Sequence, residues 1–205
     1  MKLVLRMVLV LAVITMSSAA ILSSLQQWAE PRIEAHAEKN KQKAIFKLVP
    51  ETDDFSELAA YKDDKKIYVC YDKNEDITGF AFEAAGTGYQ GEIKLMAGLT
   101  PELEKMSGLE ILAQVETPGL GAEITKYNSN PKNKSAYKFL NWFENLKIQP
   151  EIQISKDPQS QKSNQIQAIT GATISSKAVV RILNRAIEKA GPRIKEWKER
   201  QKKDE

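Results

Sequence analysis

An uncharged, mostly apolar run near the N-terminus, Met7 to Ala29, constrains this chain more than any other feature. Its 23 residues would span about 34 Å as an α-helix, and the hydrocarbon core of a bilayer is roughly 30 Å thick. Lys2 and Arg6 precede the run, and no basic residue follows it before Arg32. Because basic residues mark the cytoplasmic side, the run predicts a single-pass anchor in the cytoplasmic (inner) membrane, with the N-terminus in the cytoplasm.

A cleaved signal peptide is the alternative interpretation of the same run. Ser18-Ala19-Ala20 supplies small residues where a peptidase would cut. We favour a retained anchor, because the uncharged, apolar character continues through Ile21, Leu22 and Leu25. Both interpretations export the remainder of the chain.

Composition narrows the function of the exported part. The 205 residues include 30 basic and 27 acidic side chains, and this balance does not favour nucleic-acid binding. The chain has one cysteine, Cys70, and one histidine, His36. An intramolecular disulfide is therefore impossible, and the sequence gives no support for a zinc or iron–sulfur site or for a histidine-based catalytic triad. We predict no catalytic residue and no metal ligand.

A charged segment follows the anchor. Apolar residues recur within it at Ile33, Ala37, Ala44, Ile45 and Leu48, which indicates a helix, and Pro50 would end that helix. We therefore assign residues 1–29 to the anchor and residues 30–54 to a helical stalk whose charges face solvent.

The body of the domain contains several predicted strands. Lys66–Tyr71 and Ile77–Phe82 are rich in β-branched and aromatic residues and are joined by a polar turn, so they predict a hairpin in which Cys70 belongs to the core. The stretch Gly86–Met96 predicts a turn into a further strand, and Leu109–Val115 predicts another. These segments, with helices on either side, predict an α+β fold built on an antiparallel sheet.

Helices and loops fill the second half of the chain. Tyr137–Leu146 predicts a short helix, whose Trp142 we assign to packing, and the polar stretch Ser155–Asn164 predicts a loop. From residue 178 onwards, apolar residues recur with helical period, and Gly191-Pro192 would end that helix. The charged residues 192–205 then form a separate C-terminal segment.

The start of this last helix carries the clearest chemical signal. Thr170-Gly171-Ala172-Thr173 places two hydroxyls around a Gly-Ala pair, and Ser175 and Ser176 follow. Free N–H groups and the positive end of the helix dipole gather at such a position, and both favour a phosphate. The residues alone also allow a plain N-cap by Ser175 or Ser176.

Three motifs occur in one order and resemble the FMN-binding domain family. They are Gly88-Tyr89-x-Gly91-x-Ile93, then the loop Glu116-Thr117-Pro118-Gly119-Leu120-Gly121, then Thr170-Gly171-Ala172-Thr173. In this family, a flavin transferase joins FMN through its phosphate to the last Thr of the third motif. The resemblance therefore implies covalent FMN on Thr173 and an FMN-binding domain over residues 55–191. Gln167 stands where the family usually has an acidic residue.

The resemblance also implies which other residues contact the cofactor. They come from the last two motifs and from the serines that follow: Thr170, Gly171, Ala172, Ser175, Ser176, Glu116, Thr117, Leu120 and Gly121.

Within the family, the single anchor, the exported domain and the chain length resemble the flavin subunits of ion-translocating ferredoxin:NAD oxidoreductase (Rnf) complexes. This resemblance implies electron relay, with the membrane, a flavin transferase and the other membrane and peripheral subunits of the complex as partners, and no nucleic acid. Two alternatives stay open. One is the flavin subunit of the sodium-translocating NADH:quinone reductase, and the other is a membrane-tethered assembly or sensory module without flavin.

Overall fold

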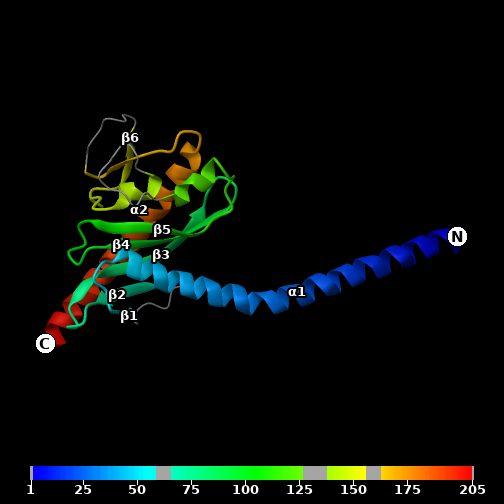
Figure 1. Cartoon of the computed structure of the whole chain (residues 1–205), viewed down its shortest axis with the longest axis horizontal. Helices are drawn as coiled ribbons and strands as arrows, with labels where there is room; N and C mark the ends of the chain where they lie inside the picture. Colours follow the sequence, from blue (N-terminus) through cyan, green and yellow to red (C-terminus); the bar gives the residue numbers. More distant parts are fainter. Residues whose placement is uncertain (1, 59–65, 127–137, 156–162, 205) are drawn as a thin grey trace. The chain divides into compact units, whose positions relative to one another are not determined.

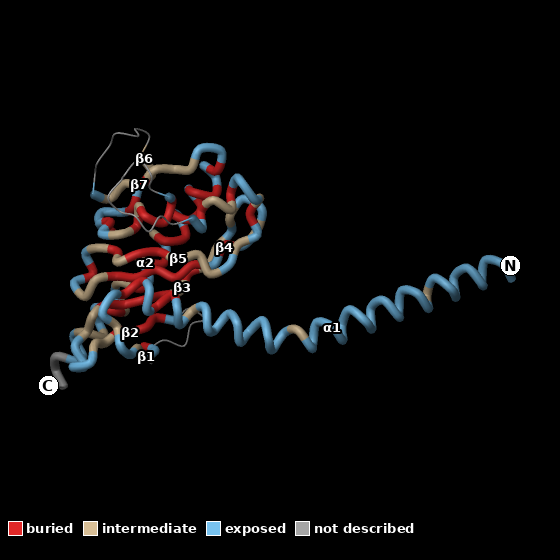
Figure 2. The backbone as a smooth tube through the Cα atoms, viewed as in Figure 1, coloured by how far each residue is buried: buried red, intermediate tan, exposed pale blue. Residues whose placement is uncertain are grey.

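A computed structural model describes residues 2–58, 66–126, 138–155 and 163–204 of the chain. The chain forms two compact units, Met1–Asn40 and Lys41–Glu205. The first unit is helical throughout its described residues. The second holds the whole sheet and the last helix, and Figure 2 shows that the buried residues gather in it.

Helix α1 spans Lys2–Leu48, and Pro31 lies inside it. Among the described residues it is the one helix long and apolar enough to cross a membrane. Its apolar side chains up to Ile33 are exposed; Leu9, for example, is 60% exposed. An isolated helix with so much bare apolar surface is unfavourable in water, so it suits an apolar surrounding. The helix ends two residues before Pro50, as the sequence predicts.

A five-stranded antiparallel sheet forms the centre of the second unit (Figure 1), with strand order β1-β2-β3-β4-β5. Neighbours in the chain are neighbours in the sheet, and each strand pairs antiparallel with the next one. The strands are β1 (Asp54–Glu57), β2 (Ile67–Tyr71), β3 (Ile77–Thr87), β4 (Glu92–Leu99) and β5 (Met106–Ala113). The predicted hairpin and α+β class are thus confirmed.

Both faces of this sheet are covered, which explains why β2 shows no alternation of apolar and polar residues. Ile67 and Val69 belong to the main core on one face. Tyr68 and Cys70 belong to a second cluster on the other face. A strand buried on both sides has no solvent-facing positions to fill with polar residues, so its sequence is continuously apolar.

The end of α1 covers one of these faces. Ala44, Ile45, Leu48 and Val49 are buried there against the second cluster. These residues lie in the segment that the sequence assigns to the stalk. They are packed because they share one face of the last two turns, while Lys47 on the other side forms an ion pair with Glu110 of β5 at 2.6 Å.

Helix α2 (Thr173–Asp204) covers the other face and packs on β3. The predicted break at Gly191-Pro192 is wrong, because the helix continues through both residues. Ile194 beyond the proline is fully buried, and Trp197 meets Phe80 of β3 edge to face, with ring centroids 6.1 Å apart. Tertiary packing therefore holds the helix together despite the proline.

Shorter elements complete the unit. The described part of the predicted helix 137–146 is a 3-10 helix, η3 (Phe139–Phe143), and another 3-10 helix, η1 (Gly121–Thr125), follows β5. Within the predicted loop 155–164, residues 156–162 lie outside the described residues. Strand β6 (Gln153–Ser155) enters that stretch, and it pairs in parallel with β7 (Gln165–Gln167), a contact that the sequence did not predict.

Candidate functional site

The third motif forms the turn into α2. Gly171 has a φ of +83°, which few residues other than glycine adopt at low cost. Helix α2 begins at Thr173, and the first helical N–H bond runs from Ser176 to the Ala172 carbonyl, at 2.9 Å. The Thr173 side chain is exposed at this N-terminus. A free hydroxyl thus lies at the positive end of the helix dipole, as the sequence predicts.

Neither serine acts as an N-cap, because both lie inside the first turn. The Ser176 hydroxyl donates to the Ala172 carbonyl and accepts from the Ile169 N–H. It therefore binds the turn that leads into α2, and the free N–H groups of the helix start are left to other acceptors.

Glu116, in the second motif, connects the first motif to the helix turn that follows the third. One of its carboxylate oxygens accepts from the backbone N–H groups of Tyr89, at 2.8 Å, and Gln90, at 3.1 Å. The other accepts from the Ser175 hydroxyl at 2.5 Å. Glu116 is only 5% exposed and Ser175 only 2%. A single buried carboxylate therefore ties the first motif and the start of α2 to the second motif.

This network favours the charged form of Glu116. Burial by itself raises the pKa of the carboxyl. The hydrogen bonds from Ser175 and from the backbone N–H groups of residues 89–91 lower the pKa, and together they prevail, so it lies below the usual value. The group is therefore a buried anion at neutral pH, with its oxygens occupied by donors.

Two glycines allow this close packing. A Cβ at Gly88 would collide with the Glu116 carboxylate, and a Cβ at Gly121 would collide with the same carboxylate and lie 2.7 Å from the Ser175 hydroxyl oxygen. Gly88 and Gly121 are thus required because the Glu116 side chain lies close to their Cα atoms, whether or not a ligand also approaches them.

The remainder of the second motif packs behind the Thr-Gly turn. Gly119 has a φ of +76°, and the Thr117 carbonyl accepts from the N–H groups of Leu120 and Ala122. A Cβ on Gly171 would lie 3.4 Å from the end of the Leu120 side chain. The loop and the turn are therefore in near contact.

The structure brings the predicted contact residues together around Glu116 and the start of α2, but it exposes only some of them. The exposed ones are Thr170, Gly171, Thr173 and Leu120, Thr117 is intermediate, and the buried ones are Ala172, Ser175, Ser176, Glu116 and Gly121. Trp142 packs on the core, as assigned.

Several apolar side chains within the motifs or next to them are exposed, and sequence reasoning missed most of them. Tyr89, Val115 and Ile174 are each more than half exposed, and Leu120 is 49% exposed. Each belongs to a motif or adjoins one, and this position in the sequence was the signal that could have identified them. A hydroxyl, free helix N–H groups and bare apolar side chains together suit a phosphate that carries a flat aromatic ring.

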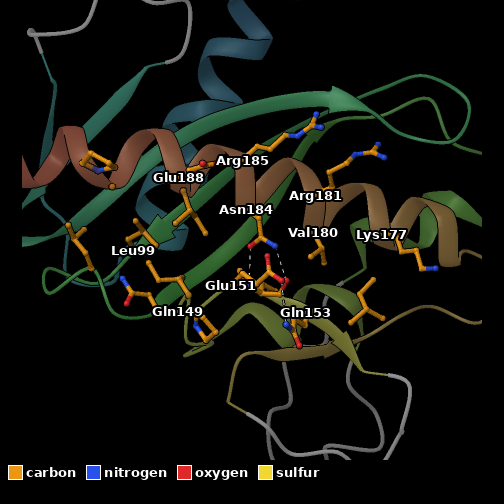
Figure 3. Close-up of a pocket in the computed structure, with 18 of the residues that line it drawn as sticks. Leu99, Gln149, Glu151, Gln153, Lys177, Val180, Arg181, Asn184, Arg185 and Glu188 are labelled. Carbon is orange, nitrogen blue, oxygen red and sulfur yellow. Dashed lines mark hydrogen bonds between the residues drawn. The ribbon is translucent and has the colours of Figure 1, made fainter.

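A large groove of the unit lies elsewhere. A groove of about 1100 Å³ runs between α2 and the segment 148–154, and Figure 3 shows the Asn184 side chain bridging it by hydrogen bonds to the backbone of Ile152, at 3.1 and 2.8 Å. No residue of the three motifs lines this groove. The motif site is therefore separate from this groove.

Comparisons with known proteins agree with this geometry. Residues 88–188 match the FMN-binding domain. The chain is 28% identical over 189 residues to a subunit of the ion-translocating oxidoreductase complex of Methanosarcina acetivorans, with 89% of this chain and 92% of the relative covered. It is 29% identical over 202 residues to a subunit of the Na⁺-translocating ferredoxin:NAD⁺ oxidoreductase complex of Acetobacterium woodii, with 91% of each covered.

Solved structures also match. One of them is a subunit of the Na⁺-translocating NADH-quinone reductase from Parabacteroides distasonis, with a TM-score of 0.48 and 24% identity over 60% of this chain and 59% of that one.

Proposed function

Because the chain belongs to the FMN-binding domain family through residues 88–188, we propose that it carries FMN joined by a phosphoester to Thr173. We further propose that it relays electrons as a subunit of a membrane-bound ion-translocating ferredoxin:NAD oxidoreductase (Rnf) complex, as the names of its relatives suggest. The single observation that carries the proposal is the exposed Thr173 hydroxyl at the N-terminus of α2, within the three joined motifs.

The chain's own residues supply binding and positioning. When bound, FMN supplies one- and two-electron chemistry. A phosphoester on Thr173 would keep a negative charge, which the free N–H groups of the helix start would stabilise. The exposed side chains of Leu120 and Ile174 offer apolar contact beside it. The protein is therefore a redox carrier without independent catalytic residues.

Forming the phosphoester requires an activated donor and an enzyme. With flavin adenine dinucleotide as donor, the Thr173 oxygen bonds to the flavin-side phosphorus, the pyrophosphate bond breaks, adenosine monophosphate leaves and the hydroxyl proton is released. A flavin transferase would catalyse this step, and the exposure of Thr173 and Gly171 supports its access.

We place the domain on the extracytoplasmic side of the membrane. The apolar part of α1 supports a retained anchor, and Lys2 and Arg6 before it support a cytoplasmic N-terminus. Protease added to spheroplasts should then digest the domain, while carbonate washing should leave the chain in the membrane. A shortened chain in the soluble fraction would contradict the anchor.

The attachment site is tested by expressing the full chain with a flavin transferase. Flavin fluorescence should persist on a denaturing gel and should vanish in Thr173→Ala. Thr173→Ser should keep it, because the hydroxyl remains. Thr125→Ala is the matched control, since Thr125 is an exposed threonine outside the three motifs. Fluorescence that survives in Thr173→Ala would refute the site.

The relay is tested in membranes with equal amounts of assembled complex. Thr173→Ala should abolish ferredoxin-dependent NAD reduction together with the coupled ion uptake, because the chain of redox centres is interrupted. NAD reduction at the normal rate in the flavin-free complex would instead favour an assembly role. Loss of NADH:quinone activity in its place would assign the chain to the alternative complex.

A further inference from the structure

We propose that Glu116 and Ser175 are a positioning pair that presents the Thr173 hydroxyl for flavin transfer. This inference rests on the proposed attachment at Thr173. It gives Glu116 a role other than contact with the cofactor, and it gives the buried Ser175 a role in the modification of its exposed neighbour.

Helical geometry supplies the first step. Residues two apart on an α-helix point about 200° apart around its axis. Ser175 is 2% exposed and faces Glu116, so Thr173 faces the opposite way and is exposed. Fixing the rotation of the first turn at Ser175 therefore fixes the direction of the Thr173 side chain.

The second step concerns the hydrogen bonds of this turn. The Ser176 hydroxyl and N–H bind only Ala172 and Ile169, which belong to the same local segment. Among the described residues, the Ser175–Glu116 bond is the one hydrogen bond that joins residues 173–176 to a distant part of the chain. It spans 59 positions of sequence.

The third step is that Glu116 is itself held firmly. Its other oxygen accepts from Tyr89 and Gln90, and a Cβ on Gly88 or Gly121 would collide with it. Both carboxylate oxygens are already hydrogen-bonded within the protein, and the charge of the group would repel a phosphate. Its position is therefore suited to anchoring α2.

The test measures flavin transfer to purified full-length protein in detergent, with a flavin transferase and flavin adenine dinucleotide. Ser175→Ala removes one hydroxyl and should lower the maximal rate roughly ten- to a hundredfold, the factor expected for a lost hydrogen bond to a charged group or a misplaced reacting atom. The protein concentration that gives half the maximal rate should stay near that of the wild type, because the exposed surface is unchanged.

Two substitutions of Glu116 test whether a conservative change keeps the rate of flavin transfer that a drastic change lowers. Glu116→Ala removes every partner and should slow transfer at least as much as Ser175→Ala. Glu116→Gln keeps an acceptor for Tyr89 and Gln90, and its amide donates to the Ser175 oxygen, so it should restore the rate to within a few-fold of the wild type. If Glu116→Ala does not fold, Ser175→Ala and Glu116→Gln carry the test.

Glu83→Ala is the matched control. Glu83 accepts from the Tyr68 hydroxyl and pairs with Lys41, both at 3.1 Å, in the sheet. The Glu83→Ala variant should accept flavin at the wild-type rate. Equal slowing in Glu83→Ala, or a wild-type rate in Ser175→Ala, would overturn the positioning role. Absence of flavin on the wild-type protein would overturn the proposed attachment instead.

Discussion

The two ends of helix α2 are held in different ways. At the N-terminal end, Thr173 and Ile174 are exposed and one buried hydrogen bond, from Ser175 to Glu116, connects the turn to the distant second motif. At the C-terminal end, Ile194 is fully buried and Trp197 packs on Phe80. A few polar contacts therefore set the geometry of the site, while apolar packing supplies stability about 20 residues away.

This separation means that substitutions at one end should leave the other end unaffected. Variants near residue 194 should change the free energy of unfolding without changing flavin attachment to the folded protein. Variants near residue 173 should change flavin attachment without changing the free energy of unfolding.

The largest effect is expected for Ile194→Ala. It empties a fully buried site in the main core and should lower the free energy of unfolding by about 2–5 kcal/mol. The same substitution at Ile174, which is 58% exposed on the same helix, is the control and should cost within about 0.5 kcal/mol. Denaturant titration measures both, and similar losses at the two positions would contradict the comparison.

A gain in stability is expected for Pro192→Ala. Removing a proline from a helix interior gains about 3 kcal/mol, and the more flexible unfolded chain costs about 1 kcal/mol, so a net gain of about 2 kcal/mol follows. Gly191→Ala, whose Cβ would meet nothing within 4 Å, should add about 0.5–1 kcal/mol. Thermal melting checks both, and a fall in melting temperature would show that the helix is distorted at this point.

These two residues also show where sequence reasoning failed. Gly191-Pro192 has the composition of a helix end, and local propensity alone predicts one. The burial of Ile194 and the contact of Trp197 with Phe80 override that propensity, and a contact across more than a hundred residues has no local signal.

The motifs were more informative than the surrounding sequence. The third motif was predicted at the entry to the last helix, which begins at Thr173, and the apolar residues of β2 and β3 predicted the hairpin. The role of Glu116 was not predictable, because its partners lie 27 and 59 positions away and a buried carboxylate has the same sequence signal as a ligand contact.

An intermediate effect is expected from pH. The pKa of Glu116 is lower in the folded protein than its usual value of about 4.5, so its ionised form stabilises the fold above that pH, and this stabilisation is lost as the pH falls below it. Glu116→Gln has no such titration. The stability difference between wild type and this variant should therefore be larger at pH 7 than at about pH 3. A difference that does not change with pH would contradict a buried anion at this site.

The smallest effect on stability is expected for Thr173→Ala, although it should remove all flavin. Its side chain is exposed, so the free energy of unfolding should change by within about 0.5 kcal/mol. Urea unfolding of the flavin-free wild type and variant provides the comparison. A larger loss would show that the hydroxyl is also part of the fold.

The contact between Phe80 and Trp197 has a consequence for biosynthesis. The sheet is complete once β5 has been made, but the part of its face that α2 covers stays bare until that helix has been made. Such non-local contacts make folding slow, since distant segments must meet before either is stabilised. The proposed attachment residue is the first residue of that helix, so a chain that stalls before α2 would lack it and would expose apolar sheet surface to chaperones and proteases.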